Sequence, residues 1–192
     1  FIGSTSGTFT DGFTLVQGSV TGDVQPSLPI RAAFYYPWFP EAWDQLGINP
    51  YTNYQPSLGF YDSSDLAVVQ QHIAVMQYGG LQAGIASWWG QGSPTDNRIP
   101  ILLQATTGAT FRWALYYEPE SQGDPSVSQI TDDLTYIRDH YGSDPGFLRI
   151  DGRFVVFVYA DAADACGMAD RWEQANTVGA YALLKVVSGY RT

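Results

Sequence analysis

The chain has 192 residues, a formal net charge of −10 and a pI near 4.3. Nucleic-acid binding depends on clustered Lys and Arg, so this acidic balance argues against a nucleic-acid partner. Aromatic and charged residues each make up 15% of the chain, and its six Trp and thirteen Tyr are too many to bury with every polar edge satisfied, so we expect some to line a groove.

The first 28 residues differ from the rest of the chain. They are rich in Gly, Ser and Thr and contain short β-like runs at Thr8–Thr10 and Phe13–Gln17, without a helical period. We therefore divide the chain into a β-rich N-terminal extension or linker at residues 1–28 and a larger domain at residues 29–192. Because Phe1 is not a natural start, we also expect that an upstream segment, such as a signal peptide, has been removed.

Five apolar runs of strand length follow the extension. They are Ile30–Tyr36, Ala83–Ser87, Phe111–Tyr117, Phe154–Tyr159 and Tyr181–Val187. Each is apolar nearly throughout rather than alternating, which is typical of strands in a parallel sheet whose two faces are both covered.

Segments with helical signals separate these strands. Three of the four begin near a capping or first-turn residue, and the first and third carry apolar residues at helical spacing. The expected helices run from Ser64 or Asp65 to Gly79, around Ile99–Ala105, from Asp124-Pro125 to near Gly142, and from Asp161 to about Gln174. Strand and helix thus alternate about four and a half times, which indicates an α/β fold.

Two α/β architectures satisfy this alternation. An open doubly wound sheet and a closed (β/α)8 TIM-type barrel both order their elements in this way. Residues 29–192 are fewer than the roughly 250 of a typical eight-stranded barrel. As a barrel, the domain would contain about the first five β/α units, and a second chain or a missing C-terminal half would complete it.

The expected strand ends carry aromatic and acidic residues. In parallel α/β folds the ligand lies at the carboxyl ends of the strands. The residues there are Tyr36, Trp38, Trp88, Trp89, Tyr117, Glu118, Glu120 and Asp161. Aromatic planes match the C–H faces of sugars and carboxylates match their hydroxyls, so this combination suggests a carbohydrate site.

The tryptophans divide into expected ligand contacts and expected core. We assign Trp38, Trp88 and Trp89 to a sugar-binding rim. We also expect that replacing Trp88 with Ala weakens sugar binding with little loss of stability. The aromatic residues assigned instead to packing are Phe34, Trp113 and Trp172.

Glu118 and Glu120 are the candidate catalytic residues. Glu118 directly follows an apolar strand, where burial raises the pKa of a carboxyl or hydrogen bonds hold it as a base. Glu120 is equally consistent with a solvated position before a helix. Asp161, a candidate substrate contact, is equally consistent with a helix cap, and Asp124 is interpreted as a cap.

Other kinds of site have little support in the sequence. Cys166 is the only cysteine and no Cys/His cluster has metal spacing, so we expect no metal and no cofactor. No phosphate-loop spacing and no G-x-S-x-G elbow occurs. His72 and His140 fall within expected helices, and no apolar run approaches the roughly 18 to 20 residues of a membrane span.

Six short segments occur in a recognisable order along residues 31–190. They are Phe34–Trp38, Pro56–Asp62, His72–Met76, Gly84–Trp89, Tyr117–Pro119 and Phe154–Tyr159. Together they resemble glycoside hydrolase family 99, the endo-α-mannosidase and endo-mannanase family, and more closely its bacterial family 99-like relatives. The resemblance implies an eight-stranded barrel and retention of the anomeric configuration.

The resemblance also implies two catalytic glutamates in an Asn-Glu-Trp-x-x-Glu-like motif late in the barrel. This motif is absent from the sequence, so Glu118 and Glu120 are not the equivalents of that pair, which we expect to lie beyond Thr192. The resemblance carries over only the sugar-contacting surface of the early strands, which comprises Tyr36, Trp38, Trp88, Trp89, Tyr117 and Glu118.

We therefore expect a secreted, extracellular glycoside hydrolase that acts on a polysaccharide or glycan. This chain would supply the substrate-binding half of the barrel and would be inactive alone. The alternative is a non-catalytic carbohydrate-binding or surface-assembly protein that kept the barrel, because a fold does not determine a function.

Overall fold

The computed structural model describes residues 6–8, 14–16, 23–161 and 164–185. Strands β1 (Ser6–Thr8) and β2 (Thr14–Val16) pair antiparallel within the expected β-rich extension. The remainder of the two β-like runs predicted there lies outside the described residues. Within the described part, no helix has both the length and the hydropathy to cross a bilayer.

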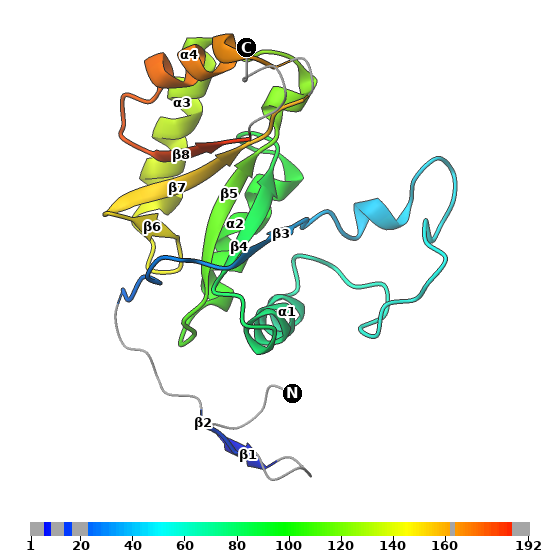
Figure 1. The fold of residues 1–192 in the computed structure, drawn as a ribbon. Helices are drawn as coiled ribbons and strands as arrows, with labels where there is room; N and C mark the ends of the chain where they lie inside the picture. Colours follow the sequence, from blue (N-terminus) through cyan, green and yellow to red (C-terminus); the bar gives the residue numbers. More distant parts are fainter. Residues whose placement is uncertain (1–5, 9–13, 17–22, 162–163, 186–192) are drawn as a thin grey trace.

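The main sheet contains the five predicted strands, all parallel and in the order of the chain (Figure 1). They are β3 (Ala32–Tyr35), β4 (Ala83–Trp88), β5 (Arg112–Tyr117), β7 (Arg153–Val158) and β8 (Tyr181–Leu184). Short β6 (Arg149–Ile150) pairs antiparallel with the start of β7. A doubly wound sheet reverses its strand order at a switch point, whereas this order is that of a (β/α) barrel. The predicted end of the last strand, residues 186–187, lies outside the described residues, as does the rest of the predicted domain up to Thr192.

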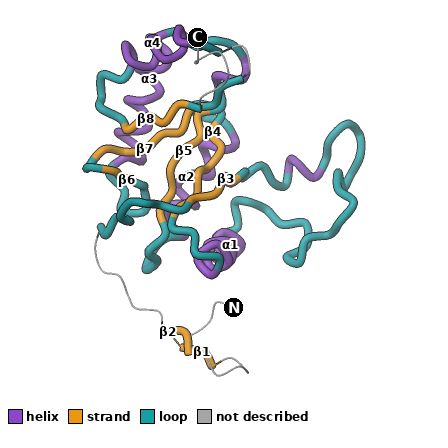
Figure 2. The backbone as a smooth tube through the Cα atoms, in the orientation of Figure 1, coloured by secondary structure: helices purple, strands orange, loops and turns teal. Residues whose placement is uncertain are grey.

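One helix follows each of the first four strands of this sheet, as Figure 2 shows in purple. The helices are α1 (Leu66–Tyr78), α2 (Pro94–Ala105), α3 (Val127–Ile137) and α4 (Cys166–Ala175). Short turns η1 (Glu41–Trp43), η2 (Pro119–Gln122) and η3 (Arg138–Gly142) lie between them. The predicted alternation of strands and helices is therefore confirmed.

Three of the four helices start at residues other than those predicted, and in two of them a serine is the capping residue. Asp65 accepts from the Ala67 N–H at the start of α1, as expected. Ser93 caps α2, which therefore begins before the predicted Ile99. Ser126, and not Asp124, caps α3, and α4 begins at Cys166 rather than at Asp161.

The two faces of the sheet have different surroundings. On one face Trp113, Leu115 and Val156 pack with helix residues such as Leu102 and Leu134. On the other face the strands pack only among themselves and against neighbouring loops, through residues that include Ala114, Val155 and Leu183. Helices cover one face, and the other is the one that lines the interior of a barrel. All residues of β4 and β5 are nevertheless buried, so the prediction that both faces are covered is confirmed for these two central strands.

The segment at residues 23–28 crosses the end of the sheet where the strands begin. Gln25 accepts from the Arg149 backbone N–H at 2.8 Å and donates to the Phe147 carbonyl at 3.1 Å. The buried Arg112 side chain donates to the Val24 carbonyl at 2.7 Å, and Asp23 pairs with Arg149. These residues, which fall inside the predicted extension, are thus bonded to the base of the sheet.

Candidate functional site

Polar and aromatic side chains gather on the helix-free face at the carboxyl ends of the strands. We call this group the mouth cluster: Tyr36, Ser87, Tyr116, Glu118, Tyr159 and Lys185. Strand register places Ser87 beside Tyr116, and side chains two residues apart on a strand share a face. The Tyr116 and Tyr159 rings are 6.0 Å apart, and the Lys185 ammonium lies 5.0 Å from the centre of the Tyr159 ring.

Glu118 is the carboxylate of the mouth cluster. It is only 4% exposed, and burial raises the pKa of its carboxyl above the usual value. A hydrogen bond with Ser87 and the positive charge of Lys185 act in the opposite direction on this pKa. The raised pKa agrees with the expectation from the position of Glu118 directly after a buried strand.

Ser87 connects Glu118 to the loop that follows β3. The Trp38 indole donates from Nε1 to the Ser87 Oγ at 3.0 Å. The Ser87 hydroxyl hydrogen is thereby left for the bond with the Glu118 carboxylate. This chain of two hydrogen bonds holds the Trp38 ring beside the buried acid.

Aromatic planes extend from the mouth cluster to its edge. The Tyr36 and Trp38 rings are 4.8 Å apart, and Trp89 lies 6.4 Å beyond Trp38. Tyr36 is 43% exposed and Trp38 is 36% exposed, so both rings have surface open to a ligand. Burial and the Glu118 charge raise the pKa of Tyr36, and raise that of Tyr116 to about 12, so these phenols stay protonated donors at neutral pH.

The loop carrying Tyr36 and Trp38 is fixed by an arginine from α2. The loop projects from the body of the molecule between β3 and α1 (Figure 1). Arg98, 5% exposed, donates from Nη1 to the Pro37 carbonyl at 2.9 Å and from Nε to the Ser64 hydroxyl at 3.2 Å. Its Nη2 contacts both carboxylate oxygens of Glu41 at 2.9 and 2.6 Å. Arg98 thus holds the peptide between the two exposed rings.

Trp88 and Tyr117 do not belong to this surface, and the prediction that they line the rim is wrong. Both are 0% exposed and face the helices. The Trp88 indole donates to Asp96 Oδ1 at 2.7 Å, and the Tyr117 hydroxyl donates to Asp133 Oδ2 at 2.7 Å. The reason is strand alternation: Ser87 and Glu118 face the mouth, so the adjacent Trp88 and Tyr117 face away.

Glu120 is also directed away from Glu118. The Glu120 side chain is fully buried and accepts from the Trp172 indole at 2.6 Å and from Arg171 at 2.9 Å. Burial raises the pKa of Glu120, and these two bonds act against the rise. Asp161 is exposed, and its backbone N–H donates to Asp164. Phe34, expected in the core, is 51% exposed on the mouth side, whereas Trp113 and Trp172 are buried as expected.

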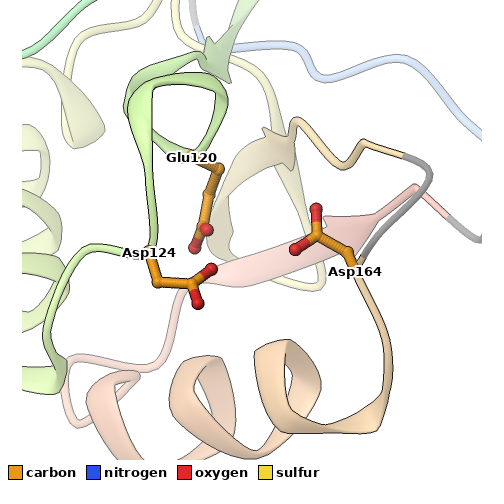
Figure 3. Close-up of side chains that lie close together, drawn as sticks. All are labelled: Glu120, Asp124 and Asp164. Carbon is orange, nitrogen blue, oxygen red and sulfur yellow. The ribbon is translucent and has the colours of Figure 1, made fainter.

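Three carboxylates lie near one another, Glu120 in η2 and the other two in the loops before α3 and α4 (Figure 3). Oxygens of Glu120, Asp124 and Asp164 lie within 4.8 Å of one another. Arg171 donates to both Glu120 and Asp124 at 2.9 Å, so its charge already balances part of theirs. We assign this group to an ion-pair network that joins η2 to α4.

Four members of the mouth cluster were missed from the sequence. They are Ser87, Tyr116, Tyr159 and Lys185. Tyr116 lies two residues before Glu118, and side chains at this spacing on a strand lie on the same face, so Tyr116 could have been predicted from the position of Glu118. Ser87 precedes two tryptophans that give the stronger signal, and Lys185 lies one residue past β8.

Comparison with known sequences gives one consistent family. The model for glycosyl hydrolase family 99 matches residues 31–181. The mouse glycoprotein endo-α-1,2-mannosidase-like protein is 28% identical over 112 residues, which cover 55% of this chain and 24% of that protein. Mouse glycoprotein endo-α-1,2-mannosidase is 27% identical over 104 residues, covering 51% of this chain and 22% of that protein. The matched part spans about a quarter of the length of these curated relatives.

Comparison with solved structures supports the same fold. A family 99 endo-α-mannosidase from Bacteroides thetaiotaomicron matches with a TM-score of 0.57 and 24% identity, covering 69% of this chain and 42% of that one. A structure described as a glycoside hydrolase-like protein matches with a TM-score of 0.58 and 14% identity, covering 87% and 56%. At these identities the similarity concerns the fold, a partial (β/α) barrel.

Proposed function

Because the chain belongs to glycosyl hydrolase family 99, we propose that it supplies the substrate-binding wall of a glycoside hydrolase that cleaves a polysaccharide or glycan. The curated relatives are named for endo-α-1,2-mannosidase, so α-linked mannosides are the substrates to test first. The mouth cluster supports this proposal most directly. It combines exposed aromatic planes with a buried carboxylate and protonated phenols, which suit the apolar faces and hydroxyls of a sugar.

Hydrolysis of a glycosidic bond generally requires two carboxyl groups that flank it. Of the two candidate catalytic residues, Glu118 faces the mouth, whereas Glu120 is bonded to Trp172 and Arg171 on the helix side, so these two carboxyl groups do not flank a common bond. We assign to Glu118 a contact with sugar hydroxyls.

The catalytic pair belongs, in this proposal, to strands that complete the barrel after Thr192. Within the described residues β3 and β8 each have a free edge, which supports completion by further strands. The expectation that the catalytic glutamates lie beyond Thr192 concerns positions outside the described residues and stays a prediction. Glutamates that follow a late strand in the full-length sequence would support it, and their replacement by Gln should abolish hydrolysis while sugar binding remains.

The second candidate is a non-catalytic carbohydrate-binding or surface-assembly protein. The observation that favours it is the opposite orientation of Glu118 and Glu120, so that within residues 23–161 and 164–185 these two carboxyl groups do not form an acid–base pair at the mouth. The two candidates differ in one measurable property. Hydrolysis and binding are both expected of the first, and binding alone of the second.

The test uses the full-length protein and α-linked manno-oligosaccharides. Released reducing ends report hydrolysis, and titration calorimetry reports binding. Trp38→Ala should weaken binding about tenfold, because an exposed aromatic plane is lost. Tyr78→Ala is the matched control, since this ring is 93% exposed on α1, remote from the mouth. Equal loss in both variants, or no binding by the wild type, would refute the carbohydrate site.

We also propose that the protein acts outside the cell, where polymeric sugars are accessible to it. Detection of the protein in the culture medium of its source cells, against a cytosolic marker, is the measurement. Recovery from the cytosolic fraction alone would contradict this part of the proposal and leave the sugar-binding part standing.

A further inference from the structure

A polar groove lies next to the mouth cluster, on the outer side of the strand ends. It has a volume of about 680 Å³ between the loop after β4 and helix α3. The residues that shape it are Trp89, Gln91, Pro119, Gln129, Asp132 and Thr135. Trp89 lies between the two regions, because its ring is 6.4 Å from that of Trp38 at the edge of the mouth cluster and it also lines the groove.

A buried carboxylate organises the wall of this groove. Asp133 is 1% exposed and accepts from the Tyr117 hydroxyl at 2.7 Å, from Gln91 Nε2 at 2.8 Å and from Gln129 Nε2 at 3.1 Å. Each amide uses one N–H on Asp133, which leaves its carbonyl oxygen and its second N–H for a ligand. In residues 23–161 and 164–185, no other side-chain partner of these two amides is found.

These fixed amides have the chemistry of a hydroxyl-binding site. An amide offers a donor and an acceptor side by side, as neighbouring sugar hydroxyls require. Holding Gln91 and Gln129 on Asp133 removes part of the entropy cost of ordering them when a ligand binds. The exposed carboxylate of Asp132 and the net charge of −10 disfavour an anionic ligand such as a phosphate.

We propose that this groove is an additional subsite that binds a neutral sugar unit of a glycan chain running from the mouth cluster across Trp89. The inference rests on the proposed carbohydrate function and extends it to longer chains. The groove unit is held by Gln91 and Gln129, whereas the units in the mouth contact Glu118 and Trp38. Affinity should therefore rise when the oligosaccharide becomes long enough to reach α3.

The experiment measures how affinity depends on chain length. S-linked α-manno-oligosaccharides, which resist hydrolysis, are titrated into the full-length protein from the disaccharide to the hexasaccharide. In Gln129→Ala and in Gln91→Ala, the long oligosaccharides should bind about three- to tenfold more weakly, and the disaccharide should bind as to wild type. Gln104→Ala, an exposed glutamine on α2, is the control and should change neither.

The outcomes separate the subsite from the proposed function. Disaccharide binding with no gain for longer chains, or equal loss for all lengths in Gln129→Ala, would overturn the subsite while the mouth site stands. Absence of binding at every length would overturn both. Since both glutamines are exposed and Asp133 keeps its remaining donors, the single variants should fold.

Discussion

The loop that carries Tyr36 and Trp38 should depend on Arg98 for its position and for much of its stability. Replacing Arg98 with Met keeps most of the aliphatic packing but removes every donor. The Pro37 carbonyl and the Ser64 hydroxyl would lose their partners in a region where Arg98 is 5% exposed. Because Pro37 lies between the two exposed rings, the variant should also bind sugar more weakly.

The expected loss follows from the exposure of each partner. A hydrogen bond from a charged donor to a buried acceptor contributes about 1.5–3 kcal/mol, and the weaker bond to Ser64 contributes less. Glu41 is 58% exposed at its side chain, so its ion pair with Arg98 is screened and contributes at most about 1 kcal/mol. We expect Arg98→Met to lower the free energy of unfolding by about 2–4 kcal/mol, and Glu41→Gln by less than about 1 kcal/mol.

Urea unfolding of the full-length variants, followed by tryptophan fluorescence, measures these losses. Hydrogen exchange of the amides at residues 38–45 reports whether the loop itself has loosened. A loss in Arg98→Met no larger than in Glu41→Gln would refute the reasoning, because the buried bond to the Pro37 carbonyl and the partly buried bond to Ser64 would then contribute nothing.

Two further predictions concern the face on which a strand residue lies. Trp88→Ala should lower the free energy of unfolding by about 3–5 kcal/mol because the ring is buried, whereas the sequence led us to expect little loss of stability. An unfolding midpoint equal to that of the wild type would show that Trp88 is not in the core. The pKa of Glu118 is raised in the folded protein, so this residue binds more protons in the folded state than in the unfolded state. Its contribution to the free energy of unfolding therefore falls as the pH rises from the usual glutamate pKa of about 4.3 through the raised value. Glu118→Gln should therefore lose less stability over that pH range, and parallel pH profiles of the two proteins by urea unfolding would contradict the burial of Glu118.

The sequence predicted the elements well because each signal is local. Apolar runs of strand length identify β4, β5 and β7, and a capping residue with helical spacing identifies α1. Order along the chain then matched order in the sheet, which is the arrangement of a barrel. Helix starts were less accurate, since several Ser and Asp residues compete for the same cap.

The site was only partly predictable because a buried strand gives no signal of its two faces. Trp88 and Trp89 are adjacent, and no alternating pattern told which of them points to the helices. Glu118 and Glu120 are two residues apart, a spacing that would place them on one face if the strand continued. Pro119 instead begins a 3₁₀ turn, which directs Glu120 to Trp172. Tyr36 and Trp38 remain predicted substrate contacts.

The bonds at residues 23–28 bear on where the polypeptide can be shortened. Arg112 at the start of β5 and Arg149 at the start of β6 repel one another, and the Asp23 carboxylate is attracted to both. A protein that begins at Pro29 would keep this pair of cations and lose their common counter-charge, together with the Val24 carbonyl that Arg112 binds. The segment that precedes β3 therefore balances the positive charge of Arg112 and Arg149 at the end of the sheet where the strands begin. A shortened protein for expression should begin upstream of Asp23.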